Sequence, residues 1–237
     1  MRSQYKISDQ FESLMLTKTI TLGRFILGPI ENNVYMLKLT SRVLLVDPTC
    51  QAKELAEYIK TTYPTDKVDI YLTHGHYDHI GAVPELCEIF PDLTIYASSK
   101  DEPLYTNPYY NGSGDTGRSF DISKYLDRMK FVDKMNSSKL VIDDIEFEVI
   151  ETPGHTPGGT CLYNKQEKML FSGDTLFRDS IGRSDFPYGN GRQLISGIVN
   201  NLMKLPDDTV VFPGHGDSTT IGEERMYNPF LKRYRNL

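Results

Sequence analysis

The sequence predicts a mixed α/β fold, and three observations support that prediction. Stretches rich in β-branched and large apolar residues alternate with stretches of helical apolar spacing. No linker, repeat or low-complexity tract divides the 237 residues, so a single domain over residues 1–237 is expected. Every histidine falls in a short block directly after a predicted strand, where loops gather residues that are distant in sequence.

The first half of the chain combines five strands with two helices. The predicted strands span residues 19–26, 34–39, 43–47, 68–73 and 94–97. A helix is predicted at 52–63 because Leu55, Ala56 and Ile59 share one face, and it should end before Pro64. A second helix is predicted at 81–90, directly after the first histidine block.

The second half has the same mixture of elements. Its predicted strands span residues 140–152, 160–164, 168–172 and 209–212. The turn Lys165-Gln166-Glu167 should pair the second of these strands with the third. Helices are predicted at 191–205 and 222–232.

Two segments lack a clear pattern. Residues 1–17 are interpreted as an N-terminal extension. Residues 101–121 contain three Gly and two Pro and are interpreted as an irregular insertion.

Composition limits the compartment and the partners. A net charge of -6 argues against a polyanionic partner, so no nucleic acid is expected. No apolar run reaches the roughly 18 residues of a membrane span, and the first residues do not form a signal peptide. The cysteines Cys50, Cys87 and Cys161 are odd in number and far apart, which favours free thiols and a cytoplasmic protein.

The five histidines have the pattern of metal ligands. The first block, Thr73-His74-Gly75-His76-Tyr77-Asp78-His79, places three of them and a carboxylate within six residues. In an extended segment His74 and His76 point the same way, and Asp78 continues that alternation. His79 lies on the opposite phase or on the turn into the next helix. One segment can therefore serve two ions, His74 and His76 one of them, Asp78 and His79 the other.

Three further residues complete the candidate set. His155 lies in Thr-Pro-Gly-His-Thr-Pro-Gly and His215 in Pro-Gly-His-Gly, where rigid turns hold a side chain at low entropic cost. Asp174 ends an apolar strand after a glycine, which packing does not explain, and its two oxygens could bridge two cations. Five His and two Asp suit two divalent ions with four to five ligands each.

These motifs resemble the metallo-β-lactamase superfamily over roughly residues 18–232. The His-x-His-x-Asp-His block is followed by Gly-His, Gly-Asp-Thr and Gly-His-Gly. Residues 172–177, 181–186, 213–224 and 228–230 resemble the glyoxalase II-like, or hydroxyacylglutathione hydrolase-like, branch. The chain ends soon after the last motif, as in a short single-domain subgroup that lacks the helical region of true hydroxyacylglutathione hydrolases.

The resemblance implies a four-layer αββα sandwich with two metal ions at one edge. It also implies that the first ion is bound by His74, His76 and His155. The second ion would be bound by Asp78, His79 and His215, with Asp174 bridging. Zn²⁺ is the expected metal, with Fe or Mn as alternatives.

The expected function is metal-dependent hydrolysis of a small-molecule thioester, such as an S-2-hydroxyacylglutathione, by a metal-bridging hydroxide. Asp78 could also orient the nucleophile or act as a general base. Arg183, Tyr109 and Tyr110 are candidate substrate contacts. The alternatives are a mononuclear iron persulfide dioxygenase using His74, His155 and Asp174, and, less favoured, a metal-dependent nuclease. The sequence gives no indication of the oligomeric state.

Overall fold

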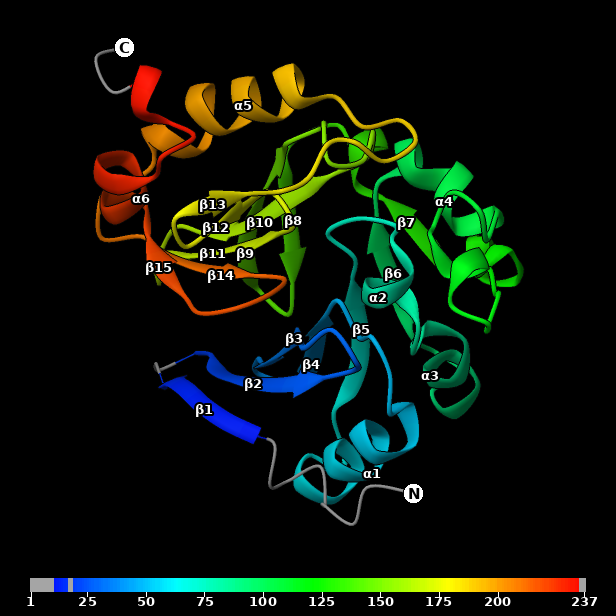
Figure 1. Ribbon diagram of the computed structural model, residues 1–237. Coiled ribbons are helices and arrows are strands. Elements are labelled where there is room, and N and C mark those ends of the chain that lie inside the picture. Colours follow the sequence, from blue (N-terminus) through cyan, green and yellow to red (C-terminus); the bar gives the residue numbers. More distant parts are fainter. Residues whose placement is uncertain (1–10, 17–18, 235–237) are drawn as a thin grey trace.

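The fold is a four-layer αββα sandwich, seen in a computed structural model that describes residues 11–16 and 19–234 (Figure 1). The first sheet has the order β1-β2-β3-β4-β5-β6-β7 and the second the order β15-β14-β11-β10-β9-β8. All strands of the first sheet precede all strands of the second in sequence. The αββα architecture implied by the sequence motifs is confirmed.

The first sheet is antiparallel at one end and parallel at the other. Strands β1 to β4 pair antiparallel, and β4 to β7 pair parallel. Its strands are β1 (Phe11–Leu16), β2 (Thr21–Leu27), β3 (Asn32–Lys38), β4 (Arg42–Val46), β5 (Lys67–Tyr71), β6 (Thr94–Ala97) and β7 (Met129–Phe131). The helices of this half are α1 (Ala52–Thr62), α2 (Tyr77–Ile80), α3 (Val83–Ile89) and α4 (Glu102–Thr106).

The second sheet is antiparallel except where β11 and β14 run parallel. Its strands are β8 (Lys139–Ile142), β9 (Ile145–Glu151), β10 (Thr160–Asn164), β11 (Met169–Gly173), β14 (Val210–Pro213) and β15 (Thr219–Thr220). A small separate hairpin joins β12 (Leu176–Phe177) to β13 (Ser180–Ile181). The helices are α5 (Gly191–Asn200) and α6 (Ile221–Tyr227).

Three apolar clusters separate the four layers. The cluster between the sheets contains side chains from both, such as Leu44 and Tyr71 from one and Phe147 and Phe171 from the other. A second cluster packs the outer face of the first sheet against α1 and α3. A third packs the outer face of the second sheet against α5 and α6. Burial of these faces is the main stabilising contribution, at roughly 25 cal/mol per Å² of apolar area.

The structure corrects several boundaries. The prediction of one strand over residues 140–152 is wrong, because Asp143 and Asp144 both have positive φ and turn the chain between β8 and β9. Phe11–Leu16, interpreted as part of an extension, form β1 at the edge of the first sheet, and residues 1–10 and 17–18 lie outside the description. The segment 101–121 is not wholly irregular, since it contains α4 and a 3₁₀ turn at Ser113–Asp115.

The structure bears on two predictions made from composition, one about the cysteines and one about membrane spans. Cys50, Cys87 and Cys161 are free, and the last two are buried. Among the described residues, no helix has the length and apolar character needed to cross a membrane.

Candidate metal centre

The first histidine block lies beyond the C-terminal end of β5. His74 and His76 occupy the loop after the strand, and their rings lie 4.9 Å apart. Asp78 and His79 lie on the single turn of α2, so the prediction that Asp78 continues an extended alternation is wrong. The predicted helix over 81–90 is shorter and begins at Val83. The helical turn still keeps the His79 ring close to the first pair, with its centroid 4.1 Å from that of His74.

The other three predicted residues reach the same place from the second sheet. His155 lies in the loop after β9, Asp174 directly follows β11, and His215 follows β14. All three strands end at the edge where β5 ends. The structure therefore brings together every histidine of the chain and both predicted aspartates.

The first donor cluster consists of His74, His76 and His155, whose donor atoms lie within 4.8 Å of one another. His76 Nδ1 lies 2.9 Å from His155 Nε2. All three residues are buried. The backbone carbonyl of Arg183 lies 2.7 Å from His155 Nδ1, so an Nδ1–H donated there leaves Nε2 free to face the cluster.

The second donor cluster consists of Asp78, His79 and His215. Asp78 Oδ2 lies 3.3 Å from His79 Nε2 and 3.2 Å from His215 Nε2. The Asn32 amide donates to the same oxygen at 2.9 Å. His215 Nδ1 faces the carbonyl of Ile30 at 3.1 Å, which directs Nε2 towards the cluster.

Asp174 lies between the two clusters. Its Oδ2 is 3.6 Å from His155 Nε2 in the first and 3.8 Å from His215 Nε2 in the second. Its Oδ1 is 3.5 Å from His79 Nε2. Gly214 permits this approach, because a Cβ there would collide with Asp174 Oδ1.

The protonation of His74, His76 and Asp78 suits cation binding. Burial lowers the pKa of His74 well below its ordinary value and that of His76 to about 3, so both imidazoles keep a free lone pair at neutral pH. Burial alone would raise the pKa of Asp78, but the charge of His79 and the hydrogen bonds from His215 and Asn32 outweigh it and hold the carboxyl ionised.

Two buried atoms at the centre lack partners. His74 Nε2 and Asp174 Oδ1 make no hydrogen bond within the described part of the chain. A buried polar atom without a partner costs about 1–3 kcal/mol. Neutral imidazole nitrogens and carboxylate oxygens aimed at a common point are donors for divalent transition metals, so the residues present fit such ions.

Asp47, at the end of β4, is a supporting residue that the sequence analysis missed. Its Oδ2 accepts from the Thr73 hydroxyl at 2.7 Å and lies 3.0 Å from His79 Nδ1. Thr73 Oγ1 in turn lies 3.0 Å from His74 Nδ1. A carboxylate behind a ligating histidine fixes the ring and raises its basicity. The sequence signal for Asp47 is an aspartate at the end of an apolar strand, which is the same signal that identified Asp174.

Asp101 is a second supporting residue that was missed. It is fully buried, and its carboxylate accepts from the backbone N–H of Gly75 at 2.9 Å and of Gly158 at 2.6 Å, and from the Thr156 hydroxyl at 2.8 Å. One side chain thus joins the loop of His74 and His76 to the loop of His155. Burial raises the pKa of Asp101 to about 6, against the effect of these hydrogen bonds. No sequence signal distinguishes Asp101 from an ordinary loop residue.

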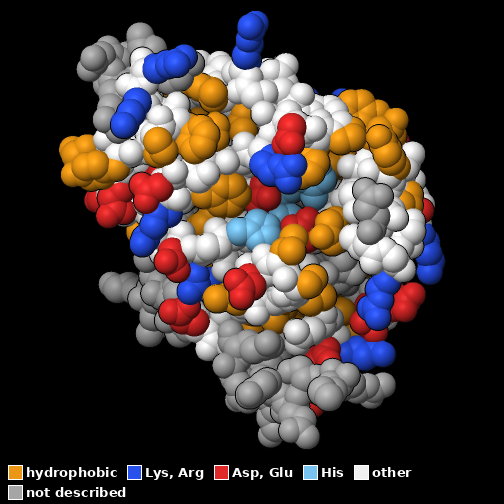
Figure 2. Space-filling view, in the orientation of Figure 1, with side chains coloured by type: hydrophobic (Ala, Val, Ile, Leu, Met, Phe, Trp, Pro, Cys, Tyr) orange, Lys and Arg blue, Asp and Glu red, His pale blue; other side chains and the backbone are white. Residues whose placement is uncertain are grey.

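The clusters form the floor of a cavity of about 650 Å³. Figure 2 shows histidine side chains in a hollow with hydrophobic side chains on several sides. The predicted substrate contacts Tyr109, Tyr110 and Arg183 all line this cavity. Its other walls come from Ile30, Tyr77, Asn111, Gly112, Phe177, Ser180, Ile181, Phe186 and Pro187.

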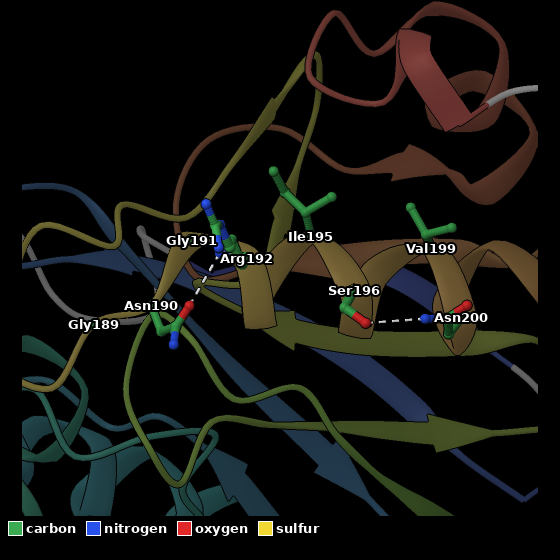
Figure 3. A pocket seen from close by; sticks show the side chains of 8 residues that line it. All are labelled: Gly189, Asn190, Gly191, Arg192, Ile195, Ser196, Val199 and Asn200. Atoms are coloured by element: carbon green, nitrogen blue, oxygen red, sulfur yellow. Dashed lines mark hydrogen bonds between the residues drawn. The ribbon is translucent and has the colours of Figure 1, made fainter.

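A second hollow, of about 660 Å³, follows the outer side of α5 (Figure 3). Its side chains are those of Asn190, Arg192, Ile195, Ser196, Val199 and Asn200, with Gly189 and Gly191. None of these residues carries a carboxylate, imidazole or thiol. The reactive groups therefore gather in the cavity over the two clusters and not along α5.

Known proteins match most of this chain. Residues 27–215 match the family model described as the metallo-beta-lactamase superfamily. The probable metallo-hydrolase YqgX of Bacillus subtilis is 35% identical over 89% of this chain and 97% of its own length. The hydroxyacylglutathione hydrolase GloC of Haemophilus influenzae is 36% identical over 79% and 86%.

Two solved structures are similar over nearly the same span. A protein described as BLEG-1 B3 metallo-beta-lactamase has a TM-score of 0.80 and 37% identity, over 89% of this chain and 99% of its own. TTHA1623 in a di-iron-bound form has a TM-score of 0.73 and 33% identity, over 88% and 99%. The αββα layers, the clustered His and Asp donors and these matches lead to one conclusion: the chain belongs to the metallo-β-lactamase superfamily.

Proposed function

We propose that the protein is a dinuclear metal-dependent thioester hydrolase of the glyoxalase II-like branch, acting in the cytoplasm. The observation that carries the proposal is the pair of donor clusters that share Asp174 at the floor of one cavity. A single ion cannot use seven such donors. The relative named hydroxyacylglutathione hydrolase GloC supports the same reaction class, with an S-2-hydroxyacylglutathione or a related thioester as substrate.

In this proposal His74, His76 and His155 hold one ion and Asp78, His79 and His215 the other, with Asp174 between them. Zn²⁺ is the favoured metal, and the di-iron form of TTHA1623 supports iron as an alternative, beside manganese. When bound, the ions supply a hydroxide from water near neutral pH and stabilise the negative charge that develops on an attacked carbonyl oxygen.

The proposed role of the protein side chains is to orient the attacking water and to contact the substrate. Within the described residues, the contacts of Asp78 with Asn32, His79 and His215 all use Oδ2. Its Oδ1 is thus the atom proposed to orient the attacking water. Because a thiolate is a good leaving group, the reaction needs no separate strong acid. Arg183, Tyr109 and Tyr110 are the proposed substrate contacts.

The decisive experiment combines metal analysis with an anaerobic assay. Protein saturated with Zn²⁺, Mn²⁺ or Fe²⁺ should approach two ions per chain and cleave S-D-lactoylglutathione at full rate without oxygen, releasing equal thiol and acid. Chelation should abolish turnover. One ion per chain, with oxygen uptake on glutathione persulfide and no thioester cleavage, would instead establish the persulfide dioxygenase alternative.

Hydrolysis of β-lactams is a second candidate, favoured by the likeness to the BLEG-1 metallo-beta-lactamase. The same donor clusters would serve attack on a strained amide carbonyl. A chromogenic cephalosporin should be tested with the same metal-loaded preparation. A kcat/KM for the cephalosporin above that for every thioester would replace the thioesterase assignment.

A further inference from the structure

We infer that the cavity selects thioesters whose thiol part is uncharged and apolar, with an aromatic group favoured, over thiols that carry carboxylates. This inference rests on the proposed thioester hydrolase function. It concerns the cavity walls, which lie outside the donor clusters, and it assigns the chemical class of the leaving thiol.

The walls are mostly apolar. Besides the donors, the cavity presents the side chains of Ile30, Phe177, Ile181, Phe186 and Pro187, together with Tyr109 and Tyr110. Tyr109 is 69% exposed and Ile30 47% exposed, so a ligand in the cavity would cover apolar surface that water now reaches. Burial of such surface favours apolar ligand groups.

Arg183 is the one cationic side chain among the residues that line the cavity, and it is already paired. Its guanidinium donates to both carboxylate oxygens of Asp185, at 3.0 and 2.8 Å. It also lies 4.4 Å from the ring centroid of Phe186, in cation–π geometry. A substrate carboxylate would have to share the guanidinium with Asp185, which occupies Nε and one Nη and carries the same charge.

Aromatic rings form one side of the cavity mouth. The rings of Tyr109 and Tyr110 lie 5.3 Å apart, and those of Tyr110 and Tyr188 lie 4.9 Å apart. This contact joins the segment 101–121 to the loop that carries Arg183. Such rings favour an aromatic ligand, because offset and edge-to-face ring pairs add to the gain from burial.

A matched pair of substrates isolates the effect of charge. S-D-lactoylglutathione and its diethyl ester share the acyl group and the scissile bond, and they differ in the two carboxylates. We expect kcat/KM for the diethyl ester to exceed that for the free acid by about tenfold. The S-D-lactoyl thioester of benzyl thiol should equal or exceed the diethyl ester.

Two variants test the named residues. Asp185→Asn frees the guanidinium and should raise kcat/KM for the free acid. The gain should be only about threefold, since the exposed Arg183–Asp185 ion pair contributes little free energy. This is a gain that misfolding cannot produce. Tyr110→Ala should lower kcat/KM for the benzyl thioester severalfold more than it lowers that for the short neutral S-D-lactoyl-N-acetylcysteamine. Tyr227→Ala, exposed on α6 and absent from this cavity, is the matched control.

The outcomes separate this inference from the proposed function. A preference of the wild-type protein for the free acid would overturn the inference and show that a carboxylate is bound beside the Arg183–Asp185 pair. An unchanged or lower kcat/KM for the free acid in Asp185→Asn, with that for the diethyl ester unaffected, would show that the pair does not exclude carboxylates. Equal effects of Tyr110→Ala and Tyr227→Ala on the benzyl thioester would overturn the aromatic part. Absence of cleavage for every thioester, with two ions bound, would instead reject the thioester hydrolase function itself.

Discussion

The first donor cluster consists of three histidines and the second of one aspartate and two histidines, and the two differ in how firmly they are held. In the first, His74, His76 and His155 are all buried, and Asp101 ties together the two loops that carry them. In the second, the His215 side chain is 26% exposed. Its Nδ1 faces the carbonyl of Ile30, a residue that is itself 47% exposed.

The two metal positions should therefore differ in their affinity for metal ions. A donor set whose loops are already fixed loses little entropy on binding, whereas an exposed loop must be ordered. The first cluster should therefore retain its ion under conditions that empty the second.

Removing Asp174, which faces both clusters, should abolish the difference in affinity between the two metal positions. Asp174→Ala deletes a carboxylate that faces both, so metal content should fall below one ion per chain and kcat should fall by about 100- to 1,000-fold. Elemental analysis and thioesterase kinetics measure the two effects. Asp208→Ala, in an exposed ion pair with Lys168, is the control. Unchanged metal content in Asp174→Ala would refute the shared-ligand assignment.

Removing one histidine from each cluster should give unequal results. His215→Ala should leave one tightly bound ion, since the first cluster is intact. His155→Ala should weaken the binding of the first ion by more than about 100-fold, because loss of an outer support alone costs 10- to 100-fold. Competition with a chelator of known affinity measures both. If His155→Ala retains the tighter ion, the ranking of the clusters is reversed.

Acid should empty the second cluster first. Burial alone would lower the pKa of His215, but its hydrogen bond to Asp78 and the charge of Asp174 raise it, so a metal must displace a proton there. The lowered pKa values of His74 and His76 remove that competition from the first cluster. Metal content should fall from two to one between about pH 7.5 and about pH 5.5. Simultaneous loss of both ions would contradict this order.

Weakening the hydrogen bonds of Asp101, which supports the first cluster, should narrow the difference in affinity between the two metal positions. Asp101→Asn replaces one accepting oxygen by an N–H group that faces a backbone donor. We expect about tenfold weaker binding of the first ion and about 1–3 kcal/mol lower stability. Chelator competition and thermal unfolding at pH 7.5 are the measurements, with Asp144→Asn, at an exposed position, as control. Loss of stability with unchanged metal affinity would mean that Asp101 supports only the fold.

Sequence patterns located the elements that bury a continuous apolar face and missed those defined by tertiary contact. Strands such as β3, β4 and β5 are dense in buried apolar residues and were predicted within a few residues. β1 was missed because its placement depends on Phe11, whose ring packs over Gly23 of β2. The turn between β8 and β9 was missed because Asp-Asp is a weaker hairpin signal than Asn-Gly or Asp-Gly.

The candidate site was more predictable than the fold around it. Histidine is rare in this chain, and all five copies lie in the site, so composition alone identified the donors. Asp47 and Asp101 were missed because their role depends on which backbone groups and rings surround them. That arrangement exists only after the two sheets pack together. The Arg183–Asp185 pair likewise becomes informative only when the cavity walls are known.

The order of strands along the chain has a consequence for assembly. The first sheet uses residues 11–131 and the second residues 139–220, so the loop near residue 136 separates two contiguous halves. Asp47, His74, His76, Asp78 and His79 belong to one half, and His155, Asp174 and His215 to the other. Neither half alone contains all the residues of the first or of the second donor cluster. A bound ion would contact residues from both halves. Its binding free energy would therefore stabilise the packing of the two halves against each other and not the folding of either sheet.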